Sequence, residues 1–174
     1  MKSKKHEKLV TALFSWETGL TKLGECIVQF QRIEEVLSIC ISSMIGRSRI
    51  IGEIVTTEMS YRAKVSVYRA LFIYHYGSDL LHKDISELLA RLNWAEQERN
   101  SMVHSLWDAS EKFPETIKRS KAACSKKGLK VNMEHITPED IEDLANLYEG
   151  IATDLIYLTE LHLPKVKIKF NKIT

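Results

Sequence analysis

The stretch that decides the fold is LLHKDISELLARLNWAEQERNSMVHSL, which occupies residues 80–106. Its apolar side chains recur at helical spacing on one face, at Ile85, Leu88, Leu89, Leu92, Ala95, Met102, Val103 and Leu106. A periodic run of this length predicts one long amphipathic helix that packs its apolar face into a core. The rest of the chain contains further stretches with the same spacing, which favours a mostly helical protein.

Two helices are predicted near the start of the chain. The first covers roughly residues 4–23, and Gly19 and Gly24 predict a break or bend there because glycine weakens a helix interior. A second helix carries an apolar side from Ile33 to Met44, and Gly46 is its expected end.

A third helix is predicted just before residue 80. Gly52 is expected in the connection that leads to it, and Thr56 or Thr57 is expected to cap its start. Gly77, followed by Ser78 and Asp79, is expected to end it and to open the helix of residues 80–106.

The sequence changes character after Pro114. Residues 115–134 are basic, contain the turn pair Lys127-Gly128 and lack helical periodicity, which predicts either a small hairpin or a mobile loop. Thr137 then offers a capping hydroxyl, followed by Pro138 and two carboxylates, and starts a last helix that runs to about residue 161. Residues 165–170 alternate lysine with apolar residues and predict a short edge strand, which its lysines would protect from aggregation.

These elements predict an all-α fold, an antiparallel bundle of four to five helices with a small β-hairpin or edge strand near the C-terminus. A chain of 174 residues is long enough for one well-packed core and short for two, so residues 1–174 are expected to form a single domain. Its core is expected at about 25–162, with the basic hairpin or loop at about 115–134 and a tail at 163–174.

Composition narrows the classes of protein. A formal net charge of +2 permits a nucleic-acid partner without requiring one. The three cysteines (Cys26, Cys40 and Cys124) form no CxxC pair, which argues against a disulfide framework and suits a reducing cytosol. The sequence shows no signal-peptide block and no apolar stretch that is long enough to span a bilayer, so we expect a cytoplasmic protein without a membrane partner.

The end of the 80–106 helix gathers side chains that can do chemistry. At about 100° per residue, Arg99 falls on the apolar face, where a cation is costly unless it is paired or faces a cleft. Asn100 and His104 are four residues apart, so their side chains can touch. An imidazole can take the proton of an RNA 2′-hydroxyl near neutral pH, and a guanidinium can stabilise charge on the phosphate. Arg99, Asn100 and His104 are therefore the candidate catalytic residues.

Arg99-Asn100-x-x-x-His104, at the end of a late helix in an all-helical domain, resembles the HEPN superfamily. That signature is an Arg, usually followed by a polar residue, and then a His. The resemblance covers about half of the chain, roughly residues 29–107, and it implies a metal-independent endoribonuclease without a cofactor. It also implies a homodimer in which the motifs of both protomers line a shared basic cleft.

The resemblance suggests partners as well. Many relatives cut single-stranded RNA as toxins in toxin–antitoxin or antiviral defence systems, often beside a nucleotidyltransferase-like antitoxin. In one branch the antitoxin modifies a Tyr two places after the His. Leu106 stands at that place here, so the resemblance does not extend to this form of control.

Each candidate residue also has a structural interpretation. Arg99 can form a salt bridge to Glu34 or Glu35, His104 can sit at the helix end because a cation suits the negative dipole end, and Asn100 can be a surface residue. Taken together in this spacing, the three favour catalysis. Some relatives have lost catalysis, so a non-catalytic dimerisation or protein-interaction module is the alternative function.

The basic stretch is a candidate surface for an RNA backbone, or alternatively a solvated loop. Its cations are Lys118, Arg119, Lys121, Lys126, Lys127 and Lys130. His75 and His82 are poorly spaced as a metal pair, and no metal site is expected.

Overall fold

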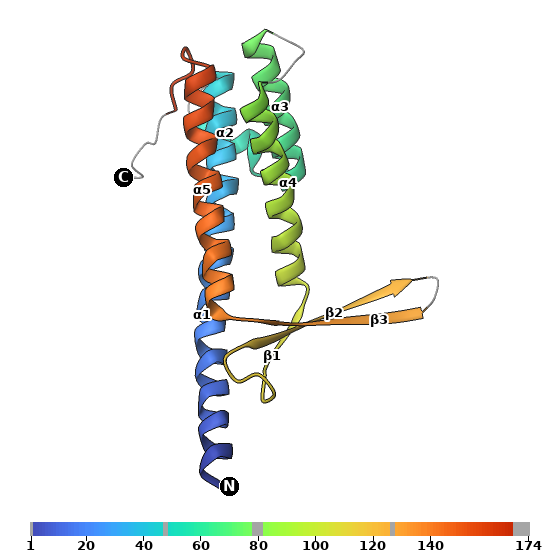
Figure 1. Cartoon of the computed structure of the whole chain (residues 1–174). Coiled ribbons are helices and arrows are strands. Elements are labelled where there is room, and N and C mark those ends of the chain that lie inside the picture. Colours follow the sequence, from blue (N-terminus) through green and yellow to red (C-terminus); the bar gives the residue numbers. More distant parts are fainter. Residues whose placement is uncertain (1, 47–48, 78–81, 126–127, 169–174) are drawn as a thin grey trace. The chain divides into compact units, whose positions relative to one another are not determined.

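A computed structural model describes residues 2–46, 49–77, 82–125 and 128–168. These residues are mostly helical and include a small antiparallel sheet (Figure 1). The elements are α1 (Lys2–Ile45), α2 (Arg49–Thr56), α3 (Tyr61–Tyr76), α4 (Lys83–Val103), β1 (Leu106–Ala109), β2 (Ile117–Ser125), β3 (Gly128–Ile136) and α5 (Pro138–His162). None of the described helices is both long enough and apolar enough to cross a membrane.

The chain divides into two compact units. Unit 1 consists of Met1–Gln29 and Gln97–Leu147, and unit 2 consists of Phe30–Glu96 and Tyr148–Thr174. Helices α1, α4 and α5 each contribute residues to both units. The expectation of one domain over residues 1–174 stays a prediction.

The predicted break in the first helix is wrong, because α1 runs through both glycines without interruption. In unit 1, Gly19 lies against the fully buried side chain of Ile117. A Cβ atom added at residue 19 would lie 2.8 Å from Cδ1 and 2.9 Å from Cγ2 of Ile117. The glycine therefore permits a close approach between α1 and β2 and does not end the helix.

Helix α2 was not predicted, and Gly52 lies inside it and not in a connection. A Cβ atom added at residue 52 would lie 2.1 Å from Cβ of Ser42 on α1, so α2 can approach α1 this closely only with glycine. Thr56 belongs to α2, where its hydroxyl donates to the carbonyl of Gly52 (2.9 Å). Ser60 caps α3 instead of Thr56 or Thr57, and it accepts a hydrogen bond from the backbone N–H of Ala63 (3.3 Å).

The ends of α1 and α3 and the start of α5 have the glycines and the cap that the sequence predicted. Gly46 and Gly77 both have positive φ, 71° and 74°, at the ends of α1 and α3. Ser78 and Asp79 lie outside the described residues. Thr137 caps α5, since its hydroxyl accepts from the backbone N–H of Asp140 (3.1 Å). The Asp140 carboxylate in turn accepts from the backbone N–H of Thr137 (3.0 Å), which completes a reciprocal cap.

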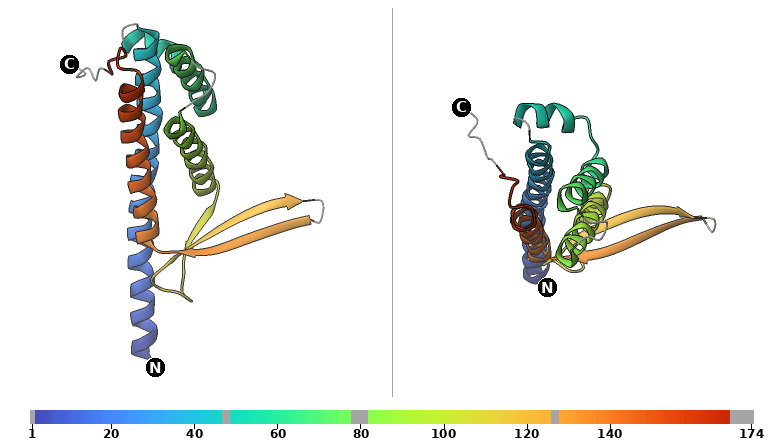
Figure 2. Two further views of the ribbon diagram at one scale, coloured as in Figure 1. Left: turned by 45° about the horizontal axis from the view of Figure 1, so that its top comes forward. Right: turned by 90° about the horizontal axis from the view of Figure 1, so that it is seen from above.

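Residues 115–134 form a hairpin and not a loop, and β1 was not predicted at all. The three strands pair in the order β1-β2-β3, and β2 and β3 make the long two-stranded ribbon seen in Figures 1 and 2. The helix of residues 80–106 ends at Val103, so the prediction that Leu106 lies on its apolar face is wrong. Residues 165–168 form no strand, and the rest of the predicted edge strand lies outside the described residues.

Unit 2 is held together by buried aromatic side chains whose hydroxyls are satisfied. Tyr61 on α3 donates to the carbonyl of Leu92 on α4 (3.0 Å), and Tyr148 on α5 donates to that of Ala95 (3.2 Å). The hydroxyl of Tyr68 lies 2.8 Å from that of the fully buried Thr159. These bonds let tyrosine bury a large ring without an unsatisfied polar atom.

Candidate functional site

The candidate catalytic residues lie on the last turn of α4, in unit 1. Arg99 and Asn100 are half-buried, and His104 is exposed directly after the last helical residue. The backbone N–H of His104 donates to the carbonyl of Asn100 (3.1 Å), which continues the helical geometry by one residue. The motif therefore spans more than one helical turn, with its imidazole open to solvent at the negative end of the helix dipole.

The end of α4 is fixed without a glycine. Two groups donate to the carbonyl of Met102: the backbone N–H of Ser105 (3.3 Å) and Nε1 of Trp107 (3.0 Å). The Ser105 hydroxyl donates to the carbonyl of Ser101 (2.6 Å). Because these bonds satisfy the last carbonyls of the helix, the chain can turn directly from the motif into β1.

The hairpin next to the motif has one basic face. The register pairs Arg119 with Glu134 and Lys121 with Asn132, so Lys130 lies diagonally across from Lys121 on the same face. Lys121 and Lys130 are exposed, whereas Arg119 forms an ion pair with Glu134. The two lysines are therefore the cations of this face that are best placed to neutralise a phosphate.

Lys118 does not join this face, and two further predicted cations cannot be placed. The side chain of Lys118 points to the opposite face, where its ammonium pairs with Asp108 (3.1 Å). Lys126 and Lys127 lie outside the described residues. Glu34, one of the two predicted salt-bridge partners of Arg99, forms an ion pair with Lys64 (3.6 Å) within unit 2.

Sequence reasoning missed Trp107. Its ring lies beneath the guanidinium of Arg119, with 5.9 Å between Cζ and the ring centroid, and so adds an aromatic surface to the basic face. Residues 106–109 (Leu-Trp-Asp-Ala) do not alternate polar with apolar residues, and they follow directly on a strong helical pattern. Nothing in the sequence marks where the helical period gives way to the two-residue one.

The opposite face of the sheet carries exposed apolar side chains beside the Lys118–Asp108 ion pair. Leu106, Leu129 and Met133 are 76%, 70% and 66% exposed. The exposed apolar side chains on this face are those of Leu106, Ala122, Cys124, Leu129, Val131 and Met133. We call it the apolar face of the hairpin. A continuous group of exposed apolar side chains is unusual on a monomer and is typical of an interaction surface.

Two of the cysteines are poor nucleophiles. Burial raises the pKa of the Cys26 thiol to about 12, and that of Cys40 to about 12 as well. Both thiols are therefore protonated at neutral pH.

The chain has no significant match to a protein-family model, to a curated protein or to a solved structure.

Proposed function

We propose that this chain is a metal-independent endoribonuclease of the HEPN type that cleaves single-stranded RNA. The observation that carries the proposal is the position of Arg99 and Asn100 at the C-terminal end of α4, with His104 directly after its last residue and exposed. The basic face of the hairpin, with Lys121 and Lys130 exposed, supports RNA as the substrate.

In this mechanism His104 removes the proton of the 2′-hydroxyl, and the 2′-oxygen bonds to phosphorus. The bond from phosphorus to the 5′-oxygen breaks, and the 5′-oxygen takes up a proton. The products are a 2′,3′-cyclic phosphate and a 5′-hydroxyl. Arg99 stabilises the negative charge on the phosphate in the transition state, and Asn100 orients the imidazole.

In this proposal the chain folds as an antiparallel helical bundle and acts as a homodimer. Contacts in unit 2 support the bundle: the Tyr61–Leu92 hydrogen bond joins α3 to α4, and the ion pair of Arg32 with Glu149 (3.7 Å) joins α1 to α5. In the homodimer, two copies of the motif would line one cleft. A role as a toxin or antiviral effector, with a nucleotidyltransferase-like antitoxin as partner, belongs to the same proposal, as does a cytoplasmic location.

The test is cleavage of labelled single-stranded RNA by tag-free protein in the presence of EDTA. We expect His104→Ala to lower the rate by about 10²–10⁴-fold, as for loss of a general base, and Arg99→Ala by about 10²–10³-fold. His6→Ala and Arg69→Ala are matched controls because both side chains are exposed and lie outside the motif.

Circular dichroism and thermal melts of every variant separate lost chemistry from lost structure. Undiminished cleavage by folded His104→Ala would overturn the proposal, and so would cleavage that EDTA abolishes in a protein that stays folded. A large loss of stability in Arg99→Ala would favour the structural interpretation of that residue.

A non-catalytic dimerisation or protein-interaction module is the second candidate. The observation that favours it is the apolar face of the hairpin. If neither the wild type nor the variants cleave any RNA, this module becomes the better account of the chain.

A further inference from the structure

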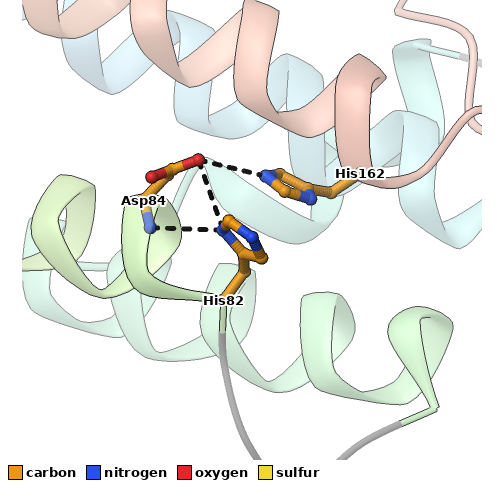
Figure 3. Close-up of side chains that lie close together, drawn as sticks. All are labelled: His82, Asp84 and His162. Carbon is orange, nitrogen blue, oxygen red and sulfur yellow. Dashed lines mark hydrogen bonds and ion pairs between the residues drawn. The ribbon is translucent and has the colours of Figure 1, made fainter.

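Three metal-ligating side chains converge in unit 2. His82 directly precedes α4, Asp84 lies in its first turn, and His162 is the last residue of α5 (Figure 3). Oδ2 of Asp84 lies 3.2 Å from Nδ1 of His82 and 3.7 Å from Nε2 of His162. All three ligand atoms lie within 4.8 Å of one another.

Hydrogen bonding within the cluster leaves its lone pairs poorly satisfied. Nδ1 of His82 accepts only a long hydrogen bond from the backbone N–H of Asp84 (3.4 Å), which a metal ion could replace, and Oδ2 lies 3.2 Å from the same nitrogen. Nε2 of His162 is buried and has no hydrogen-bond partner among the described residues. A cation between the three atoms would give each of these lone pairs a partner.

Aromatic side chains pack against His162, whereas His82 and Asp84 are accessible to solvent. The His162 side chain is only 12% exposed, and its ring packs edge-on against those of Phe72 and Tyr76, with 6.2 Å between centroids in each pair. The side chains of His82 and Asp84 are about half exposed, which provides a path for an ion to enter. The ring centroids of His82 and His162 lie 4.4 Å apart, so both imidazoles reach the same space.

The donor set selects the kind of metal. Two imidazole nitrogens and one carboxylate oxygen suit Zn²⁺ and its neighbours in the first transition row, whereas Mg²⁺ and Ca²⁺ prefer oxygen ligands alone. Tetrahedral Zn²⁺, with bonds of about 2.0–2.2 Å, places its ligand atoms roughly 3.3–3.6 Å apart. The distances of 3.2 Å and 3.7 Å from Oδ2 fall on either side of that range.

We propose that His82, Asp84 and His162 bind a divalent transition metal, Zn²⁺ above all, through three protein ligands. Water would occupy the fourth position, because three protein ligands leave a tetrahedral site open. The ion would join the start of α4 to the end of α5, and binding would therefore stabilise the folded chain.

This proposal is independent of the proposed nuclease. The three ligands belong to unit 2, whereas Arg99 and His104 belong to unit 1, and no step of the proposed cleavage uses a metal. His75, which was judged a poor metal partner of His82 from its spacing, has its Nε2 2.6 Å from the carbonyl of Met44 and is not part of the cluster.

The test uses full-length, tag-free protein that has been stripped of metal with EDTA and then freed of EDTA. Co²⁺ is added as a probe, because tetrahedral Co²⁺ absorbs strongly in the visible range, and Zn²⁺ is then added to displace it. We expect one Co²⁺ per chain and full displacement by Zn²⁺. Zn²⁺ is also expected to raise Tm, since it binds only the folded state.

His162→Phe is the decisive variant because it keeps an aromatic ring against Phe72 and Tyr76 but removes the ligand nitrogen. It should weaken Co²⁺ binding at least tenfold and abolish the Zn²⁺-induced rise in Tm. His6→Ala removes an exposed imidazole of α1 and should bind Co²⁺ like the wild type.

Absence of visible absorption with the wild type at millimolar Co²⁺ would overturn the proposal. Equal binding by wild type and folded His162→Phe would overturn it too, because the metal would then sit on other surface groups. If His162→Phe does not fold, Asp84→Asn takes its place, with the same expected loss and the same contrary result. RNA cleavage enters neither readout, so failure of the nuclease proposal leaves this test intact.

Discussion

Two glycines of α1 show how much the function of a residue depends on its neighbours. Gly19 lies against Ile117, whereas a Cβ atom added at Gly24 would meet nothing within 4 Å. Both lie inside a regular helix, so both carry the same entropic cost relative to alanine. The difference between them is therefore a difference in packing alone.

This difference makes opposite predictions for the same substitution. Gly24→Ala should stabilise the protein by about 0.5–1 kcal/mol through helix propensity. Gly19→Ala gains the same term but forces Ile117 to move, at a cost of about 1–3 kcal/mol, so a net loss of about 1 kcal/mol is expected. Urea unfolding monitored by circular dichroism measures both, and equal stabilisation of the two variants would contradict the close approach.

At the scale of single elements, the N-terminal cap of α5 stabilises the start of that helix. Thr137 and Asp140 satisfy each other's backbone N–H groups, and the hydrogen bonds from the hydroxyl and backbone N–H of Thr137 lower the pKa of the Asp140 carboxyl. A carboxyl whose pKa is lowered by folding stabilises the folded state above its ordinary pKa of about 3.9. That contribution is lost as the pH falls through the lower, folded pKa.

The cap predicts how the stability of the folded protein changes at acid pH. Thr137→Ala should cost about 1 kcal/mol at neutral pH. Asp140→Asn should lower stability at pH 7 and flatten the loss of stability below about pH 4, because one proton-linked group has been removed. Glu139→Gln, which removes a charge from the same turn, is the matched control. Urea midpoints across pH 2–7 measure these effects, and identical acid profiles for Asp140→Asn and Glu139→Gln would contradict the account.

At the scale of the whole molecule, the sheet presents two chemically different faces. Lys121 and Lys130 lie on the basic face, and Leu129 and Met133 lie on the apolar face. Under the proposed nuclease function the basic face would bind the RNA backbone, and under the alternative function a second copy of the chain would cover the apolar face. The two candidate functions of the chain can therefore be separated by substitutions on opposite sides of one hairpin.

Substitutions on the two faces should give different results. Leu129→Asp with Met133→Asp should reduce the mass measured by sedimentation to that of a monomer, because burying two carboxylates in an apolar interface is costly. Lys121→Asp should leave the mass unchanged and weaken RNA binding, with a salt dependence reduced by about one phosphate contact. A monomeric wild type would contradict the dimer, and unchanged RNA binding in Lys121→Asp would contradict the basic face.

Much of the fold could be predicted from local chemistry. The glycines at the ends of α1 and α3 and the cap of α5 act over a few residues, so their effect can be inferred without tertiary structure. The proximity of Asn100 and His104 along the helix could be predicted for the same reason, since residues four apart are neighbours on a helix. The metal ligands could not be predicted, because His162 lies far along the chain from His82 and Asp84.

The amino-acid sequence by itself determined the helical character of this protein and the helix that carries Arg99 and Asn100, because helical period and capping depend on near neighbours. Only the tertiary structure decided that Gly19 and Gly52 continue their helices, since the reason is a close approach of Ile117 and Ser42. It also decided which side chains share a face of the sheet, because strand register joins residues that are distant in sequence. The convergence of His82, Asp84 and His162 has the same origin, as packing alone brings the ends of α4 and α5 together in unit 2.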